Sequence, residues 1–215
     1  MYLSDTDLSA AIESGRLIVG PKPSAIDATS IDLHLDAVDE AKVWDVDRLT
    51  KDNRDRGLPD LQLNIARMNY GKISLDYLRS PPREGDAPSD ARVVRRDDCV
   101  VLRPGGFLLW QTREIVGTPK EAPEFICFVD GKSTRARTGL VVHLTAPTIH
   151  AGWSGNITLE MTNCGPLHLV LHEGDAVAQI VVAKITSPPT YGFRTSPSAT
   201  LGQTHVTGSP KGQGM

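Results

Sequence analysis

Residues 156–162 have the sequence NITLEMT, and their regular alternation decides the class of fold. One face of an extended chain would carry the apolar residues, which are Ile157, Leu159 and Met161. The other face would carry the polar residues, which are Asn156, Thr158, Glu160 and Thr162. Side chains of a strand point alternately to its two faces, so the stretch predicts a half-buried β-strand with Glu160 facing away from the core.

Similar short apolar segments lie on both sides of this stretch, separated by turns that contain Gly and Pro. They are CVVLR (99–103), FLLWQTREIV (107–116), FICFV (125–129), GLVVHLT (139–145), LHLVL (167–171) and AVAQIVVAKI (176–185). Short strands at regular spacing are typical of sandwiches and jelly rolls rather than of alternating β and α units. We therefore predict an all-β domain.

The first 98 residues add two legible elements and one unclear region. A short helix is predicted after the capping residue Ser4, with Gly15 beyond its last turn and an apolar face formed by Leu8, Ala11 and Ile12. A strand with one buried face is predicted from the alternation of Ile31, Leu33 and Leu35. Residues 39–98 mix charge runs such as KDNRDR with a Pro-rich passage at 81–88, which indicates a surface loop.

Composition limits the classes of function. The 215 residues are 40% hydrophobic and 23% charged, as in ordinary globular proteins, and one domain accounts for the length. The net charge of −3 gives no general attraction for nucleic acid or an anionic membrane, so we expect neither partner. No apolar stretch reaches the roughly 18 residues of a membrane span, and the N-terminus lacks a signal-peptide pattern, so we expect a cytoplasmic protein.

The cysteines and the missing motifs narrow the chemistry further. The cysteines, Cys99, Cys127 and Cys164, are odd in number and far apart, which argues against a disulfide framework and favours buried small side chains. The H-x-E and P-C-x-x-C motifs of zinc-dependent deaminases do not occur in the sequence. A Rossmann glycine fingerprint, a P-loop and a G-x-S-x-G motif are also missing.

Three polar features are candidates for a functional site. Residues 131–137, GKSTRAR, would cradle phosphate oxygens through hydroxyls, cations and backbone N–H groups, or would form a solvated hairpin turn. Glu160 is either an active carboxylate or an ordinary surface acid. His150 and Trp153, in the turn-rich stretch TAPTIHAGWSG, are either a base- or sugar-binding pair or a half-buried structural pair.

Taken in order, these segments resemble the dCTP deaminase and dUTPase superfamily, and its deaminase branch in particular. The segments are LSDTDL, GRLIV, TSIDLHL, RPGGFLLWQTRE, GKSTRARTGL, TAPTIHAGWSGNITLEMTN and EGDAVAQI. The resemblance implies a distorted, dUTPase-like jelly roll with a short N-terminal helix, formed by a single domain over residues 1–215. It also implies a homotrimer with active sites between subunits, and a flexible C-terminal lid at residues 186–215 that closes over the nucleotide.

The same resemblance implies the site residues. The phosphate-binding and catalytic run is similar to Lys132, Ser133, Thr134 and Arg137, and the catalytic glutamate falls on Glu160. The Ser133 hydroxyl and the Ala146 carbonyl would hold the attacking water, while Thr158 and Leu159 would line the pyrimidine. The remaining candidate substrate-binding residues are His150, Trp153, Gln179, Tyr191 and Gln203.

The implied reaction is hydrolytic deamination of dCTP to dUTP and ammonia, which feeds dUMP and dTTP synthesis. Glu160 would take a proton from water, hydroxide would attack C4 of cytosine, and the carboxyl would protonate N3 and then the leaving amine. Arg137, if it lies beside Glu160, would favour the ionised carboxylate. Mg²⁺ would bind through the substrate phosphates, and no zinc is expected.

Two departures from the family pattern leave alternatives open. His150 stands where the family has an Asp that faces the deoxyribose and that activates water in dUTPases, which argues against dUTP hydrolysis as the main activity. Ala199 and Thr200 replace a usual Lys and Tyr, so a lower phosphate or a modified cytosine nucleotide stays open as substrate. The alternatives are a bifunctional deaminase and dUTP diphosphatase, or a non-catalytic nucleotide-binding relative.

Overall fold

The N-terminal helix forms where its capping signals predict it. The structure, a computed structural model, describes residues 1–65, 69–187 and 189. Helix α1 (Asp5–Glu13) begins at Ser4, whose hydroxyl accepts a hydrogen bond from the Asp7 backbone N–H, while the Asp7 carboxylate accepts one from the Ser4 N–H. The helix is followed by Gly15, at a positive φ of 70° that suits glycine.

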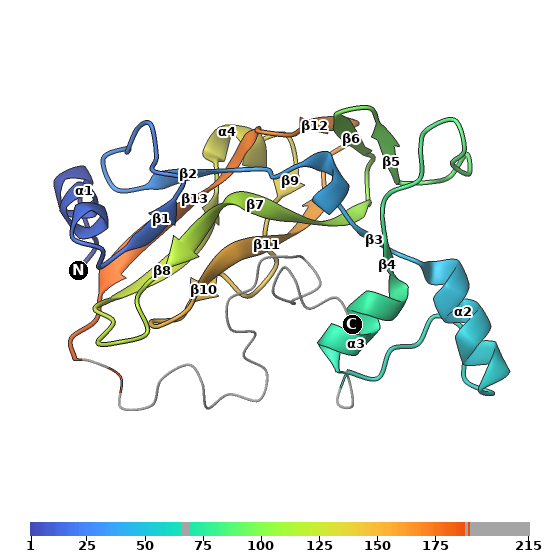
Figure 1. Cartoon of the computed structure of the whole chain (residues 1–215). Coiled ribbons are helices and arrows are strands. Elements are labelled where there is room, and N and C mark those ends of the chain that lie inside the picture. The colour runs from blue at the N-terminus through green and yellow to red at the C-terminus, as the bar shows by residue number, and fades with distance from the viewer. Residues whose placement is uncertain (66–68, 188, 190–215) are drawn as a thin grey trace.

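Two four-stranded antiparallel sheets form the body of the molecule (Figure 1). The first sheet has the order β1 (Ile18–Gly20), β7 (Phe107–Gly117), β11 (Ser154–Asn163) and β9 (Leu140–Val141). The second has the order β10 (Thr148–Ile149), β8 (Phe125–Gly131), β13 (Ala176–Lys184) and β2 (Ile31–His34). The two sheets share one apolar core, which includes Trp110 and Leu159 from the first and Cys127 and Ile180 from the second. The predicted all-β jelly roll is confirmed.

A third sheet and a short ribbon complete the β structure. The third sheet has the order β12 (Leu169–His172), β6 (Cys99–Leu102) and β5 (Val93–Arg96), and the ribbon pairs β3 (Val43–Trp44) with β4 (Leu78–Arg79). The strands predicted after residue 98 all form, but the segment GLVVHLT is extended only over Leu140–Val141. The short helix α4 (Ser133–Ala136) lies between β8 and β9.

The unclear region 39–98 contains helices that the sequence pattern did not predict. After the 3-10 turn η1 (Val38–Glu40) come α2 (Val46–Asp55) and α3 (Tyr70–Tyr77), which lie beside one end of the sheets (Figure 1). The Tyr77 hydroxyl donates a hydrogen bond to Asp52 at 2.9 Å, and the Arg48 guanidinium stacks over the Tyr77 ring at 5.7 Å. The passage 81–88 is mostly exposed, as predicted for a surface loop.

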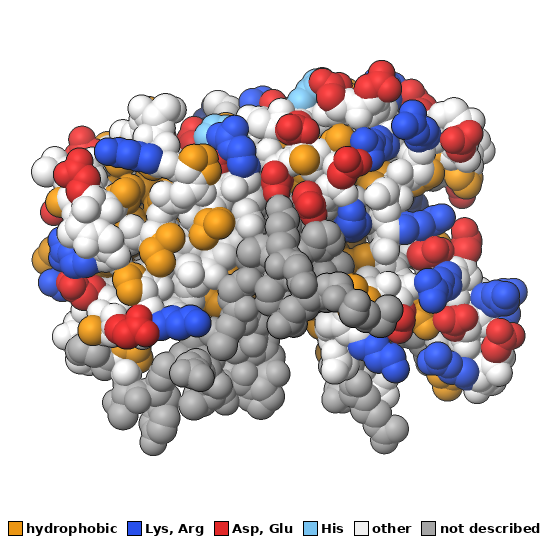
Figure 2. Space-filling model, in the orientation of Figure 1, with side chains coloured by type: hydrophobic (Ala, Val, Ile, Leu, Met, Phe, Trp, Pro, Cys, Tyr) orange, Lys and Arg blue, Asp and Glu red, His pale blue; other side chains and the backbone are white. Residues whose placement is uncertain are grey.

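The surface of the described residues is mixed in charge. Figure 2 shows Lys and Arg side chains interspersed with Asp and Glu over the face in view. Within the described residues, no helix has the length and apolar character needed to span a membrane.

Candidate active site around Glu160

Glu160 lies on the face of β11 that points away from the core. Its strand neighbours Leu159 and Met161 are fully buried in the core, as the alternation predicts. Glu160 itself is half-buried, so it is not fully exposed to solvent. Its cross-strand partner on β7 is Leu109, whose side chain is only 4% exposed. The carboxyl group therefore stands on a covered part of the outer face.

The segment after β9 supplies hydrogen bonds to this carboxyl group. Strands β9 and β11 are antiparallel, with Leu140 opposite Asn163 and Val141 opposite Thr162. The chain that continues past Val141 therefore runs alongside β11 toward Glu160. There the Leu144 backbone N–H donates a hydrogen bond to the Glu160 carboxylate, and His143 lies close enough to act on it electrostatically.

The protonation of Glu160 reflects a balance of these neighbours. Burial raises the pKa of the Glu160 carboxyl above its usual value. Hydrogen bonds from the backbone N–H groups of Leu144 and Glu160, and then the charge of His143, oppose this rise without cancelling it. A carboxyl with a raised pKa takes up and releases a proton closer to neutral pH, which suits general acid and base catalysis.

Tyr70 is a neighbour of Glu160 that the sequence reasoning missed. It begins α3, in the region 39–98. Burial raises the pKa of the Tyr70 phenol, and the negative charge of Glu160 raises it further. No local pattern links the two residues, because they meet only when α3 packs near β11. His143 was also missed, and its buried Nδ1 has no hydrogen-bond partner among the described residues.

The polar run GKSTRAR forms α4, a short helix on the surface. Lys132 is its N-cap residue, and the Lys132 Nζ forms an ion pair with the Asp32 carboxylate on β2. Ser133, Thr134 and Arg137 are exposed. Within one chain, the run is therefore neither a simple hairpin turn nor an enclosed phosphate cradle, and its hydroxyls and guanidinium groups face outward.

Arg137 does not lie beside Glu160 of the same chain. Arg137 precedes β9, and β9 runs from the Asn163 end of β11 toward Glu160. Among the residues that the structure describes, the side chain whose electrostatic interaction lowers the pKa of Glu160 is instead His143. The expected pairing of Arg137 with Glu160 is thus not found within one subunit.

The other candidate residues occupy different environments. Thr158 is half-buried on the face that carries Glu160, whereas the Leu159 side chain belongs to the core and offers a ligand only its backbone. Ala146 and His150 are exposed in the loops around β10, and Trp153 is buried at 8% exposure. Gln179 is half-buried on β13 and accepts a hydrogen bond from the Ser30 hydroxyl at 3.2 Å. Tyr191 and Gln203, and nearly all of the predicted lid at 186–215, lie outside the described residues.

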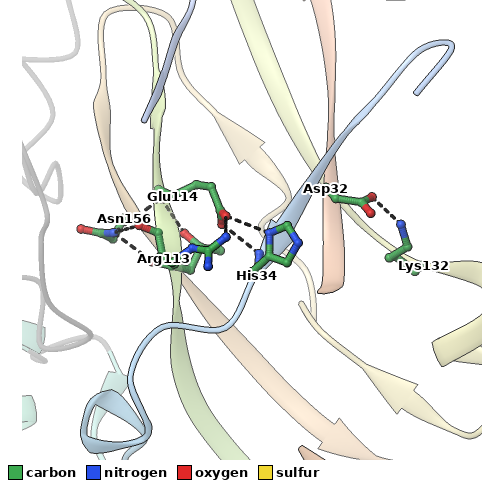
Figure 3. Close-up of polar contacts among 7 residues, drawn as sticks. Asp32, His34, Arg113, Glu114, Lys132 and Asn156 are labelled. Atoms are coloured by element: carbon green, nitrogen blue, oxygen red, sulfur yellow. Dashed lines mark hydrogen bonds and ion pairs between the residues drawn. The ribbon is translucent and has the colours of Figure 1, made fainter. Parts of the chain in front are cut away.

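A bulge in β7 connects β11 to β2 (Figure 3). The register jumps between the pairs Asn156–Ile115 and Thr158–Gln111, so β7 contains extra residues. The Asn156 amide fills this bulge by donating to the carbonyls of Thr112 at 2.8 Å and Arg113 at 3.2 Å. Asn156 is therefore 6% exposed, which corrects its predicted place on the polar outer face.

The same bulge directs Glu114 toward β2. The Glu114 carboxylate accepts a hydrogen bond from the His34 backbone N–H at 2.8 Å and lies 2.8 Å from the His34 Nδ1. Two residues earlier on β2, Asp32 pairs with Lys132 of the polar run (Figure 3). Strand β2 thus connects the bulge to α4 through its outward-facing side chains.

The cysteines are free, and their exposure differs. Cys99 and Cys127 are buried as predicted, but Cys164 is exposed, which corrects the expectation for that residue. Burial raises the pKa of the Cys127 thiol to about 12 and also raises the pKa of Cys99. The Cys127 thiol is therefore protonated at neutral pH and is a poor nucleophile.

Comparison with known proteins gives one consistent family. Residues 2–185 match the sequence model described as dCTP deaminase-like. The chain is 34% identical over 205 residues to the dCTP deaminase of Rhodospirillum rubrum, covering 93% of this chain and 90% of that one. It is 32% identical over 197 residues to the dUMP-forming dCTP deaminase of Mycobacterium ulcerans, covering 91% and 87%.

One solved structure is similar in fold. It is the 2′-deoxycytidine 5′-triphosphate deaminase of Agrobacterium tumefaciens, with a TM-score of 0.55 and 16% sequence identity. The similarity covers 86% of this chain and 48% of that one, so this chain spans about half the length of the solved protein.

Proposed function

This chain belongs to the dCTP deaminase-like family, and on that premise we propose that it hydrolyses the exocyclic amine of dCTP, releasing dUTP and ammonia. The observation that carries the proposal is the Glu160 carboxyl, which is half-buried on the outer face of β11 and has a raised pKa. A proton-shuttling group of this kind is what the reaction requires, because water must lose a proton and the amine must gain one.

Glu160 would act in both directions within one turnover. The ionised carboxylate takes a proton from water, and the resulting hydroxide attacks C4 of the cytosine ring. The carboxylic acid then gives its proton to N3. The regenerated carboxylate takes the proton of the new C4 hydroxyl and passes it to the exocyclic amine, which leaves as ammonia while C4 becomes a carbonyl carbon. The raised pKa supports this cycle, since a carboxylate whose acid has an ordinary pKa is a weaker base and would accept the proton of water less readily.

A second copy of the chain would complete the site. The exposed run of Ser133, Thr134 and Arg137 is separated from Glu160 of its own chain, so these groups are available to a neighbouring subunit. We propose a homotrimer in which Ser133 and Arg137 of one subunit act with Glu160 of the next. In that arrangement the Ser133 hydroxyl and the Ala146 carbonyl hold the attacking water, and Arg137 favours the ionised Glu160.

The phosphates would be bound by the cationic run at α4. Lys132, Arg135 and Arg137 give this surface three positive groups, beside the hydroxyls of Ser133 and Thr134. The Asp32 carboxylate is already paired with Lys132, so it offers little charge to a divalent cation. We therefore expect Mg²⁺ to be held by the nucleotide phosphates, whose negative charge it would neutralise.

The proposal is tested by incubating the purified chain with dCTP and Mg²⁺ and following ammonia and the uracil nucleotide. We expect turnover by the native chain and a loss of kcat on the order of 10²–10⁴-fold in Glu160→Gln. The matched control is Glu13→Gln, the same change at an exposed position of α1, which should retain native activity. Equal activity in Glu160→Gln and native chain would refute the role of Glu160.

A bifunctional reaction is the second candidate, and the relatives supply the reason to test it. The proteins of Mycobacterium ulcerans and Streptomyces coelicolor, 32% and 31% identical, are named dUMP-forming. His150 stands at the position where the resemblance to the family implies the water-activating Asp of dUTPases. We therefore expect dUTP as the product, and chromatography that finds dUMP and pyrophosphate instead would favour the bifunctional enzyme.

A further inference from the structure

Three metal-ligating side chains meet on the sheet formed by β5, β6 and β12. They are Asp98, Cys99 and His172, and their potential ligand atoms all lie within 4.8 Å of one another. Cys99 is buried, whereas Asp98 and His172 are exposed. No step of the proposed deamination uses these residues, and the strands that carry them form a separate sheet from β11.

The backbone holds the three residues in place. Cys99 and His172 are direct cross-strand partners of the antiparallel pair β6 and β12, so their side chains project on the same face. Asp98 ends the two-residue turn between β5 and β6, and its carbonyl accepts a hydrogen bond from the Glu173 N–H at 3.3 Å. A group held on paired strands and a short turn needs little reorganisation to bind an ion.

A second carboxylate lies near the His172 ring. The Asp175 carboxylate lies 3.8 Å from the His172 Nδ1 and also accepts the His172 backbone N–H at 2.8 Å. A carboxylate beside one ring nitrogen orients the imidazole and makes the other nitrogen a better ligand. Asp97 and Glu173 add negative charge at the same end of the sheet.

The ligand types select the class of ion. We propose that Asp98, Cys99 and His172 bind a borderline-soft divalent cation such as Zn²⁺, with water in the fourth position. A thiolate, an imidazole and a carboxylate are all zinc ligands, and in a tetrahedral zinc site such atoms are about 3.5 Å apart. The ligand atoms lie within 4.8 Å of one another, so binding requires the exposed Asp98 and His172 side chains to move closer to Cys99.

Cobalt absorption tests the site directly. The full chain, reduced and freed of metal by a chelator, is titrated with Co²⁺, which gives a near-ultraviolet charge-transfer band only when a thiolate is bound. We expect this band in the native chain and in Cys164→Ser, which removes the exposed cysteine, but not in Cys99→Ser. A missing band in the native chain, or a band that persists in Cys99→Ser, overturns the proposal.

A second variant guards against misfolding of Cys99→Ser. The His172 side chain is 51% exposed, so His172→Gln should fold normally. We expect this variant to bind Zn²⁺ at least about 10-fold more weakly in competition with a chromogenic chelator. Native affinity in His172→Gln overturns the proposal.

Discussion

Glu160 shows how remote neighbours set the chemistry of one side chain. Because burial raises the pKa of its carboxyl, the ionised form is lost at a higher pH than for an ordinary glutamate. The ionised form must act first as base, so kcat/KM should fall as the pH drops through this raised pKa. A pH–rate profile of the native chain measures the pH at which kcat/KM falls. A fall at the usual pKa of a glutamate would contradict the raised pKa of Glu160.

A substitution at Tyr70 should change the pH at which kcat/KM falls on the acid side of the profile, its acid limb. The phenol lies close enough to Glu160 to respond to its charge, and Tyr70 begins α3. Tyr70→Ala should admit water, lower the pKa of Glu160 and move the acid limb of kcat/KM to lower pH. Tyr70→Phe is the matched control, because it keeps the ring and should leave the limb in place. Identical profiles in Tyr70→Ala and the native chain would show that the ring does not cover Glu160.

At the residue scale, the sequence predicted the face of the strand on which a side chain lies, but not the residues that surround that side chain. Alternation placed Glu160 correctly on the outer face of its strand, because the period of a strand is local. Its neighbours include Tyr70, which responds to its charge, and Leu144, which donates a backbone hydrogen bond, and only the folded chain brings them together. At Asn156 the predicted face was wrong, because alternation within one strand carries no information about a bulge in the partner strand.

At the element scale, the bulge in β7 depends on the amide of Asn156. Asn156→Ala would leave the Thr112 and Arg113 carbonyls without this donor in a buried setting. We expect the free energy of unfolding to fall by about 1–3 kcal/mol, measured by urea denaturation. Asn64→Ala, at an exposed position, should change it by less than about 0.5 kcal/mol. Equal stability of the two variants would mean that the bulge does not need the amide.

The elements themselves were predicted unevenly for a physical reason. Strands after residue 98 carry either alternating or fully apolar patterns, which report their burial directly. Helix α2 has the sequence VDRLTKDNRD, in which the only buried residue is Asn53. It is stabilised by polar contacts to α3, such as the Tyr77–Asp52 hydrogen bond, rather than by an apolar stripe. Hydrophobic periodicity therefore gives no signal for it.

At the scale of the whole molecule, the proposed trimer predicts complementation between inactive chains. Glu160→Gln and Arg137→Ala would each be nearly inactive alone. Mixed, unfolded and refolded together, they should recover about a quarter of native activity, because random assembly unites an intact Glu160 with an intact Arg137 of the neighbour at one site in four. Light scattering measures whether the refolded chains assemble as trimers. No recovery from verified mixed trimers would place both residues of a site in the same subunit.

The ribbon of β3 and β4 has a consequence for how this protein can diverge. Trp44 pairs with Leu78, so the excursion between them leaves and rejoins the jelly roll at a single point. We therefore expect insertions or deletions within residues 45–77 to leave the register of the main sheets intact. Yet the same excursion carries Tyr70 to the neighbourhood of Glu160. Residues 45–77, and with them a neighbour of the reacting carboxyl, can thus be exchanged in evolution as one segment. Laboratory recombination between relatives could exchange the same segment at the β3–β4 pair.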